Sequence, residues 1–342
     1  AGSDPRINNA HAKRAQSYME LGNRVKALRD FDVVIKNAPK SHIAAMSLQL
    51  SARIQRDAKN YDDVIDRLEN LLKNHPDLKA SSKTNSHYWL GSAYFKLDKF
   101  EPAIPHLQKA QSRNSAAYGK QTFMLLLLSH YSLKDVDELK LIIDQNKDLE
   151  LAEQIPLPVY RWLGSQCYNA GQFSESAKYL TLGCEKGVAR TTPAVIWRLL
   201  AKAQYKSKQY AAALTSIDNL LSVETEDASR VNGLLDKSQI LLGLKKYPEA
   251  KETGMKALAL RPSGKVKAGL LLAIGDAFFN LSDFASAAEH YVLIVETFSE
   301  HEAHSEALYQ LIQSLEKQQK NEAAASYKAM LKKDYPNYKA QR

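Results

Sequence analysis

A repeat of 37 residues is the feature that most constrains how this chain of 342 residues can fold. In the second half of the sequence a small residue recurs at steps of 37, and in the first four copies an aromatic residue stands three positions before it. The small residues are Ser176, Ala213, Ala250, Ala287 and Ala324, and the aromatic residues are Phe173, Tyr210, Tyr247 and Phe284. Self-similarity at a fixed period of this size is typical of arrays in which each repeat packs on its neighbours. The sequence therefore predicts one extended array rather than two or three ordinary domains.

The first half of the chain keeps the same step and then drifts. Ala27 pairs with Val64 at a distance of 37 residues, whereas Ala103 follows Val64 by 39. The two extra residues are placed around Lys79 to Lys83, at the boundary between the second and third repeats. We count about nine repeats in all, of which the fourth is degenerate.

Each repeat is predicted to form two helices joined by a short turn. Apolar residues recur at spacings of three and four on either side of a polar break, such as Lys206 to Gln209. The small residue after the break allows the second helix to approach the first, and the aromatic residue fills the space beside the turn. The predicted fold is an all-α solenoid of about nine antiparallel helix-turn-helix repeats.

Composition supports a folded helical protein. The chain has only 14 Gly and 11 Pro, with 44% hydrophobic and 25% charged residues. The longest apolar run, Phe123 to Leu128, is far shorter than the roughly 20 residues that a membrane-spanning helix needs. We therefore expect no insertion into a membrane.

Several repeats carry a recognisable motif. The third repeat has Leu90, Gly91, Tyr94, Phe100 and Ala103, and the eighth has Gly275, Phe278, Phe284, Ala287 and Tyr291. Over roughly residues 8–338 the sequence resembles the tetratricopeptide repeat (TPR) family, although the usual repeat of that family has about 34 residues. The resemblance implies a right-handed superhelix that acts as a scaffold or adaptor and binds a protein or peptide in its concave groove. The last two repeats are similar to bacterial TPR arrays of the cell envelope, which favours the periplasm or envelope over the cytoplasm.

The resemblance also implies which residues contact a partner, since the first helices of such repeats line the groove. The residues at the matching positions are aromatic, basic or amide-bearing, which suits peptide capture. They are Tyr88, Phe95, Lys96, Arg161, Tyr168, Asn169, Arg198, Lys202 and Tyr205. Arg161 and Arg198 are predicted to bind an acidic ligand. In the alternative interpretation, Tyr168 and Tyr205 pack between hairpins and the basic residues are solvated.

The sequence offers little chemistry for an enzyme. His301, Glu302 and His304 place two histidines three positions apart, whereas the zinc-binding motif needs a spacing of four. Cys167 and Cys184 lack metal-ligand spacing and are interpreted as small buried side chains. We expect no enzymatic activity and no catalytic residue, metal site, cofactor or small-molecule substrate.

The basic charge of the chain motivates one rival interpretation. A formal net charge of +9 and an isoelectric point of about 9.2 would suit a nucleic-acid-binding helical repeat protein. The basic residues are spread along the chain with acidic residues between them, and no dense basic run occurs. A protein or peptide partner, acidic in character, is therefore favoured over nucleic acid, and oligomerisation is left open.

The domain boundaries follow from the degenerate repeat and from two prolines. Residues 1–7 are expected to form a tail, and residues 8–146 an N-terminal subarray of about four repeats. Pro156 and Pro158 interrupt helix formation, so residues 147–158 are predicted to form a hinge or linker. Residues 159–342 are expected to form a C-terminal subarray of about five repeats.

Overall fold

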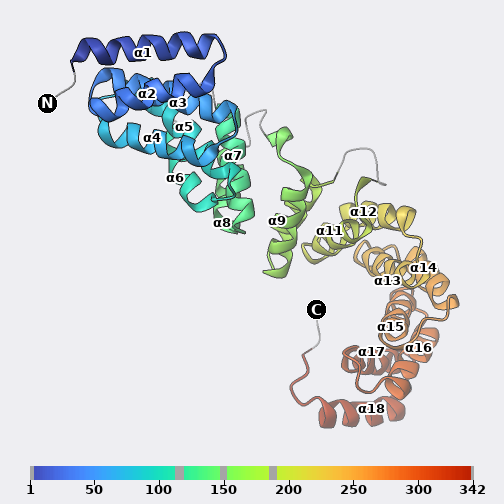
Figure 1. The fold of residues 1–342 in the computed structure, drawn as a ribbon. Helices are drawn as coiled ribbons and strands as arrows, with labels where there is room; N and C mark the ends of the chain where they lie inside the picture. The colour runs from blue at the N-terminus through green and yellow to red at the C-terminus, as the bar shows by residue number, and fades with distance from the viewer. Residues whose placement is uncertain (1–3, 112–118, 147–151, 185–190, 340–342) are drawn as a thin grey trace. The chain divides into compact units, whose positions relative to one another are not determined.

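The computed structural model describes residues 4–111, 119–146, 152–184 and 191–339. Over these ranges the chain forms eighteen α-helices and one short 3-10 helix, and it contains no strand. Successive helices stack as hairpins (Figure 1). The prediction of an all-α helical repeat fold is confirmed, and no described helix is long and apolar enough to cross a membrane.

The chain divides into two compact units, Ala1–Ile155 and Pro156–Arg342. The helices of the N-terminal unit are α1 (Pro5–Glu20), α2 (Arg24–Asn37), α3 (His42–Asp57), α4 (Tyr61–Asn74), α5 (Ala80–Lys96), α6 (Phe100–Ala110), α7 (Gly119–Ser132), α8 (Val136–Gln145) and η1 (Ala152–Gln154). Those of the C-terminal unit are α9 (Leu157–Asn169), α10 (Phe173–Leu182), α11 (Ala194–Lys206), α12 (Tyr210–Val223), α13 (Asp227–Gly243), α14 (Tyr247–Ala259), α15 (Gly264–Asn280), α16 (Phe284–Thr297), α17 (His304–Lys317) and α18 (Asn321–Asp334). Each odd-numbered helix is the first helix of a hairpin.

Two boundaries differ from those expected. Helix α1 begins at Pro5, so the predicted tail of residues 1–7 is shorter than expected, since proline is favoured in the first turn of a helix. In the predicted linker 147–158, residues 147–151 lie outside the described residues, η1 follows them, and α9 begins at Leu157. Pro158 therefore stands in the first turn of α9, where its missing N–H is not needed. The hinge itself stays a prediction.

The same turn joins the two helices of every described hairpin. In the turn between α11 and α12, Lys208 has a φ of 62° and its N–H donates to the carbonyl of Tyr205 at 2.9 Å. The next N–H, from Gln209, donates to the carbonyl of Gln204 at 2.7 Å. These two bonds form a Schellman motif, which satisfies the last carbonyls of the first helix. The left-handed position is occupied in turn by Gly22, Lys59, Asp98, Lys134, Gly171, Lys208, Lys245, Ser282 and Gln319.

The aromatic residue after the turn packs as predicted. In four hairpins its ring meets, edge to face, an aromatic ring five residues earlier in the last turn of the first helix. The pairs are Phe95–Phe100, Tyr168–Phe173, Tyr205–Tyr210 and Phe279–Phe284, with ring centroids 5.3–5.6 Å apart. Edge-to-face packing is a favoured geometry for aromatic pairs, so each pair fixes the hairpin beside its turn.

Small residues allow the two helices of a hairpin to approach closely. The repeated residues Ser176, Ala213, Ala250, Ala287 and Ala324 are all buried. A second set of small residues lies on the first helices, where a Cβ on Gly164 would stand 2.6 Å from Cγ of Leu180. A Cβ on Gly275 would stand equally close to the Tyr291 ring. A larger side chain at either glycine would force the helices apart.

Candidate functional site

A groove of about 520 Å³ lies on the first helices of the C-terminal unit. We call it the tyrosine groove. Its walls come from α9, α11 and α13, together with one residue just before α17. It is lined by Tyr168, Ala201, Lys202, Tyr205, Lys206, Asp236, Gln239, Ile240 and Glu302. The structure thus brings together three of the nine predicted partner-binding residues, namely Tyr168, Lys202 and Tyr205.

The helical period and the 37-residue repeat together build this groove. On α11, Lys202 and Tyr205 are three positions apart and therefore share a face of the helix. Gln239 follows Lys202 by 37 residues, and Tyr205 follows Tyr168 by 37, so equivalent positions of neighbouring repeats line one surface. The first helices of consecutive hairpins lie next to one another, since α9 contacts α11 and α11 contacts α13.

Asp236 is the unusual polar group of the tyrosine groove. Its side chain is only 15% exposed, and Lys202 Nζ lies 3.9 Å from its Oδ2 atom. Within the described ranges no donor forms a hydrogen bond to Oδ2. Burial raises the pKa of the Asp236 carboxyl, and the charges of Lys202 and Arg198 offset part of that rise. A buried acceptor without a donor costs free energy, and the nearby Lys202 ammonium offsets part of that cost.

Tyr168 and Tyr205 serve the hairpins as well as the groove. Each is half-buried and packs edge to face on the aromatic residue that begins the following helix. Burial raises the pKa of both hydroxyl groups, with a further contribution from Asp236 in each case. Both side chains are therefore neutral at physiological pH and present a ring together with a hydroxyl that can donate or accept. Tyr168 and Tyr205 thus both pack within their hairpins and line the tyrosine groove.

The two predicted arginines are bound within the chain. Arg161 Nε donates to the carbonyl of Gly183 at 2.7 Å. Arg198 Nη2 donates to the carbonyl of Ser229 at 3.1 Å and lies 3.4 Å from a carboxylate oxygen of Glu224. Neither arginine lines the tyrosine groove. This differs from the expectation that both face a ligand, because each arginine reaches residues that follow the second helix of its own hairpin: Gly183 after α10, and Glu224 and Ser229 after α12.

The remaining predicted residues lie apart from the tyrosine groove. Tyr88, at the same repeat position as Arg161, is only 7% exposed and packs against Trp89 with centroids 4.8 Å apart. Phe95 is half-buried against Phe100. Lys96 and Asn169 are exposed at the last residues of α5 and α9.

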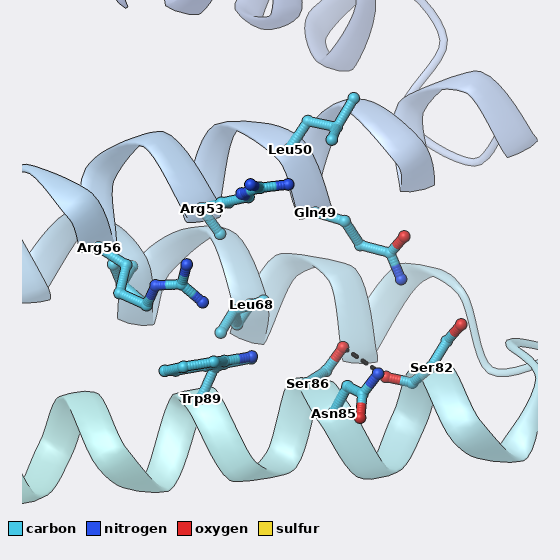
Figure 2. A pocket seen from close by; sticks show the side chains of 11 residues that line it. Gln49, Leu50, Arg53, Arg56, Leu68, Ser82, Asn85, Ser86 and Trp89 are labelled. Carbon is cyan, nitrogen blue, oxygen red and sulfur yellow. Dashed lines mark hydrogen bonds between the residues drawn. The ribbon is translucent and has the colours of Figure 1, made fainter. Parts of the chain in front are cut away.

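A second pocket, of about 260 Å³, lies between α3 and α5 of the N-terminal unit, and we call it the tryptophan pocket (Figure 2). Its lining residues are Gln49, Leu50, Ala52, Arg53, Arg56, Val64, Leu68, Ser82, Asn85, Ser86 and Trp89. None of them was predicted from the sequence. The repeat pattern could have identified Arg53. Ser92 holds the repeat position of Lys202, and Arg53 precedes Ser92 by 39 residues, the spacing between the second and third repeats. Trp89 occupies the repeat position of Asp236.

A third groove, of about 470 Å³, contains two carboxylates from α15 and α17. The Tyr291 hydroxyl donates to Asp276 Oδ1 at 2.7 Å, and burial raises the pKa of the Asp276 carboxyl to about 7. Glu306 accepts hydrogen bonds from the Tyr338 hydroxyl and from Gln310. These bonds tie the C-terminal segment to the array.

The histidines and the cysteine considered for metal or nucleophilic chemistry have partners or burial that account for them. They contain no group of three or more His, Cys, Asp and Glu side chains that could hold a metal ion. His304 is buried between the Tyr335 hydroxyl at 2.8 Å and the carbonyl of Val295 at 3.3 Å, and His301 accepts from the N–H of Ala303. Burial raises the pKa of the Cys184 thiol, which disfavours the reactive thiolate.

Three parts of the chain are similar to known repeat families. Three family models described as tetratricopeptide repeat match residues 13–41, 84–116 and 272–339. A tetratricopeptide repeat and J domain-containing co-chaperone from Fusarium oxysporum is 24% identical over 232 residues, which are 67% of this chain and 42% of that protein. This chain thus spans less than half the length of that relative.

Three solved structures illustrate the similarity in fold. Apo RapI is 16% identical, with a TM-score of 0.47 and coverage of 76% of this chain and 77% of its own. MamA from Desulfovibrio magneticus RS-1 is 16% identical, with a TM-score of 0.45 and coverage of 54% and 97%. The APC/C hetero-tetramer Cut9-Hcn1 is 12% identical, with a TM-score of 0.43 and coverage of 98% and 82%.

Proposed function

Because the chain is a tetratricopeptide repeat protein, we propose that it is a non-catalytic scaffold or adaptor that binds a protein or peptide in the tyrosine groove. Proteins of this family generally mediate protein–protein interactions. The fold by itself does not select a binding surface, so the proposal depends on the chemistry of the groove.

The observation that carries the proposal is the largely buried Asp236 carboxyl group that lines the same groove as two tyrosines. Tyr168 and Tyr205 offer ring area at a low cost in side-chain entropy, because their rings are already packed. The Asp236 carboxyl group lines the groove beside Lys202, and a backbone N–H of an extended peptide would donate a hydrogen bond to this group. Aromatic area beside a carboxyl group and a lysine suits a peptide segment.

The charges of the groove define the partner further. Lys202 and Lys206 are exposed, while Asp236 and Glu302 line the same surface. The two lysines and two carboxylates balance, so this groove favours a polar segment of mixed charge over a strongly acidic one.

A matched pair of variants tests the proposal. Lys202→Gln/Lys206→Gln removes two positive charges from the groove, and Lys332→Gln/Lys333→Gln removes two from exposed positions on α18. Peptides selected from a displayed random library on the wild-type chain are labelled, and their Kd values are measured by fluorescence anisotropy. We expect the groove variant to weaken binding at least tenfold and the α18 variant to change it less than twofold, with helicity unchanged by circular dichroism.

Two results would contradict the proposal. Equal affinity of the selected peptides for both variants would show that the tyrosine groove is not the binding surface. Recovery of nucleic acid in place of peptide, with an affinity that falls steeply with salt, would favour the rival interpretation based on the net charge of +9.

A further inference from the structure

We propose that the tryptophan pocket of the N-terminal unit recognises a carboxylate side chain, glutamate or aspartate, of a bound peptide. This rests on the proposed function, because the carboxylate is taken to belong to a protein partner. The inference adds a second recognition surface to the chain and assigns it a ligand chemistry that the charge-balanced tyrosine groove does not share.

The charge of the pocket is the first argument. Arg53 and Arg56 contribute two guanidinium groups, and no Asp or Glu is among the residues that line it. The amides of Gln49 and Asn85 add neutral donors from α3 and α5. The tyrosine groove and the third groove both contain carboxylates, so the tryptophan pocket differs from them in having two guanidinium groups and no carboxylate among its lining residues.

Arg53 lacks a carboxylate partner within the part of the chain that the structure describes. It is exposed and forms none of the ion pairs found there, although it lies among the lining residues. A guanidinium binds a carboxylate through two parallel N–H bonds when the geometry permits. An arginine at the wall of a concave pocket, with no acid from the described residues beside it, is therefore available to one from a partner.

Arg56 is already held in place by the tryptophan. Its guanidinium carbon lies 3.9 Å from the centroid of the Trp89 ring, and Figure 2 shows the group lying over that ring. Nε and Nη2 donate to Asp57 Oδ1 at 3.1 and 2.9 Å, and neither bond uses Nη1. Stacking and these bonds restrict the side chain before a ligand arrives, so less entropy is lost when a carboxylate binds.

The shape of the pocket favours an acidic side chain over a nucleotide. The Arg56 guanidinium covers one face of Trp89, which removes that face as a stacking surface for a base. The floor is aliphatic, with Ala52, Val64 and Leu68 buried beneath it. Methylene groups of glutamate or aspartate would contact this floor while the carboxylate reaches the guanidinium groups.

The indole N–H signal of Trp89 gives a local readout in the full chain. The chain contains three Trp, and loss of one signal in Trp89→Phe assigns the Trp89 signal in a ¹⁵N–¹H NMR spectrum. The probe is the peptide acetyl-Gly-Ser-Glu-Gly-Ser-amide, and its counterpart carries Gln in place of Glu. We expect the Glu peptide to shift the Trp89 signal saturably, with a Kd at least fivefold lower than that of the Gln peptide and with weakening as salt increases.

Matched variants separate the pocket from overall charge. Arg53→Gln should raise the Kd of the Glu peptide at least fivefold, whereas Arg24→Gln, at an exposed position on α2, should change it less than twofold. The inference is overturned by equal effects of the two variants or by equal Kd values for the Glu and Gln peptides. It is also overturned if the Trp89 signal does not shift at about 20 mM peptide, a concentration that would saturate a site with a Kd below about 1 mM. A larger response to a dT oligonucleotide than to the Glu peptide would also overturn it.

The two proposals fail independently. Lys202→Gln/Lys206→Gln leaves every lining residue of the tryptophan pocket in place, so the Trp89 response to the Glu peptide should persist in that variant. If Trp89 does not respond while the selected peptides still bind the tyrosine groove, the carboxylate inference falls and the proposed function stands.

Discussion

Replacing the left-handed turn residues of the C-terminal unit by glycine should stabilise it. Lys208, Lys245, Ser282 and Gln319 all have φ values near 60°. A residue with a side chain loses roughly 1–2 kcal/mol of stability in this conformation, and glycine avoids that strain. Glycine also lowers the free energy of unfolding by about 0.4–1 kcal/mol, because its unfolded chain has more conformational entropy. The net gain is about 0.5–1 kcal/mol per site. The four turns form separate backbone hydrogen bonds, so the gains should add to about 2–4 kcal/mol.

Thermal and urea unfolding followed by circular dichroism measure this gain. For a unit of this size each kcal/mol raises Tm by about 2–4 °C, so the fourfold variant should unfold about 4–16 °C higher. The urea midpoint should rise with an unchanged slope, because the substitutions alter little buried surface. The control is Lys256→Gly at an exposed position in the last turn of α14, which should destabilise by up to about 1 kcal/mol.

The converse substitution tests the same reasoning. Gly171 has a φ of 74°, and a Cβ added to it would have no neighbour within 4 Å. Gly171→Ala therefore introduces backbone strain without a steric clash, and it should destabilise by roughly 1–2 kcal/mol. If the fourfold glycine variant lowers Tm as Lys256→Gly does, or if Gly171→Ala is neutral, the energetic argument about these turns is wrong.

Two further predictions concern pH and the end of the array. Between about pH 4 and 7 native Asp276 holds a proton that the unfolded chain has released, so the C-terminal unit should lose stability as pH rises and Asp276→Asn should raise Tm at pH 8 by several degrees. Burial, with His106 and Lys109, lowers the pKa of His87 to about 4, so this residue should destabilise the N-terminal unit as pH falls from about 6.5 to 4. Tyr335→Phe should leave buried His304 without one partner and destabilise the last hairpin by about 1–3 kcal/mol, measured by hydrogen exchange of α18, whereas unchanged exchange would refute that role.

The sequence was sufficient to predict the helical repeat because packing restricts the residues that recur. Ala213 and Ala250 lie where two helices meet, and only a small side chain fits there. Phe173 and Tyr210 lie beside the turns and pack on a ring of the preceding helix. The turn position itself is not visible in the composition, because seven of the nine left-handed residues in the described hairpins are not glycine.

The grooves could be predicted only in part, because two neighbouring positions of a first helix face different surroundings. The position of Lys202 and Gln239 lines a groove, whereas Arg198, four residues before Lys202, contacts Glu224 after α12 and Ser229 in the first turn of α13. Both positions carry long polar side chains, so residue type does not separate them. Arg53 could have been identified because it lies one repeat, 39 residues, before Ser92. The tryptophan pocket around it depends on the distance between α3 and α5, which the sequence does not give.

The repeat thus separates positions that determine the fold from positions that determine recognition. In the C-terminal unit the small residue after each turn is always Ser or Ala, because it is buried where two helices meet. The groove position holds Arg53, Lys202, Gln239 and Asp276 in different repeats, and each of these residues lines a pocket. Packing restricts a side chain that faces a groove less than one between two helices, so its charge can differ from repeat to repeat, at a cost in stability where burial raises the pKa of a carboxyl group, as for Asp276. One scaffold can therefore present a basic, a balanced and an acidic surface at different points along the same chain.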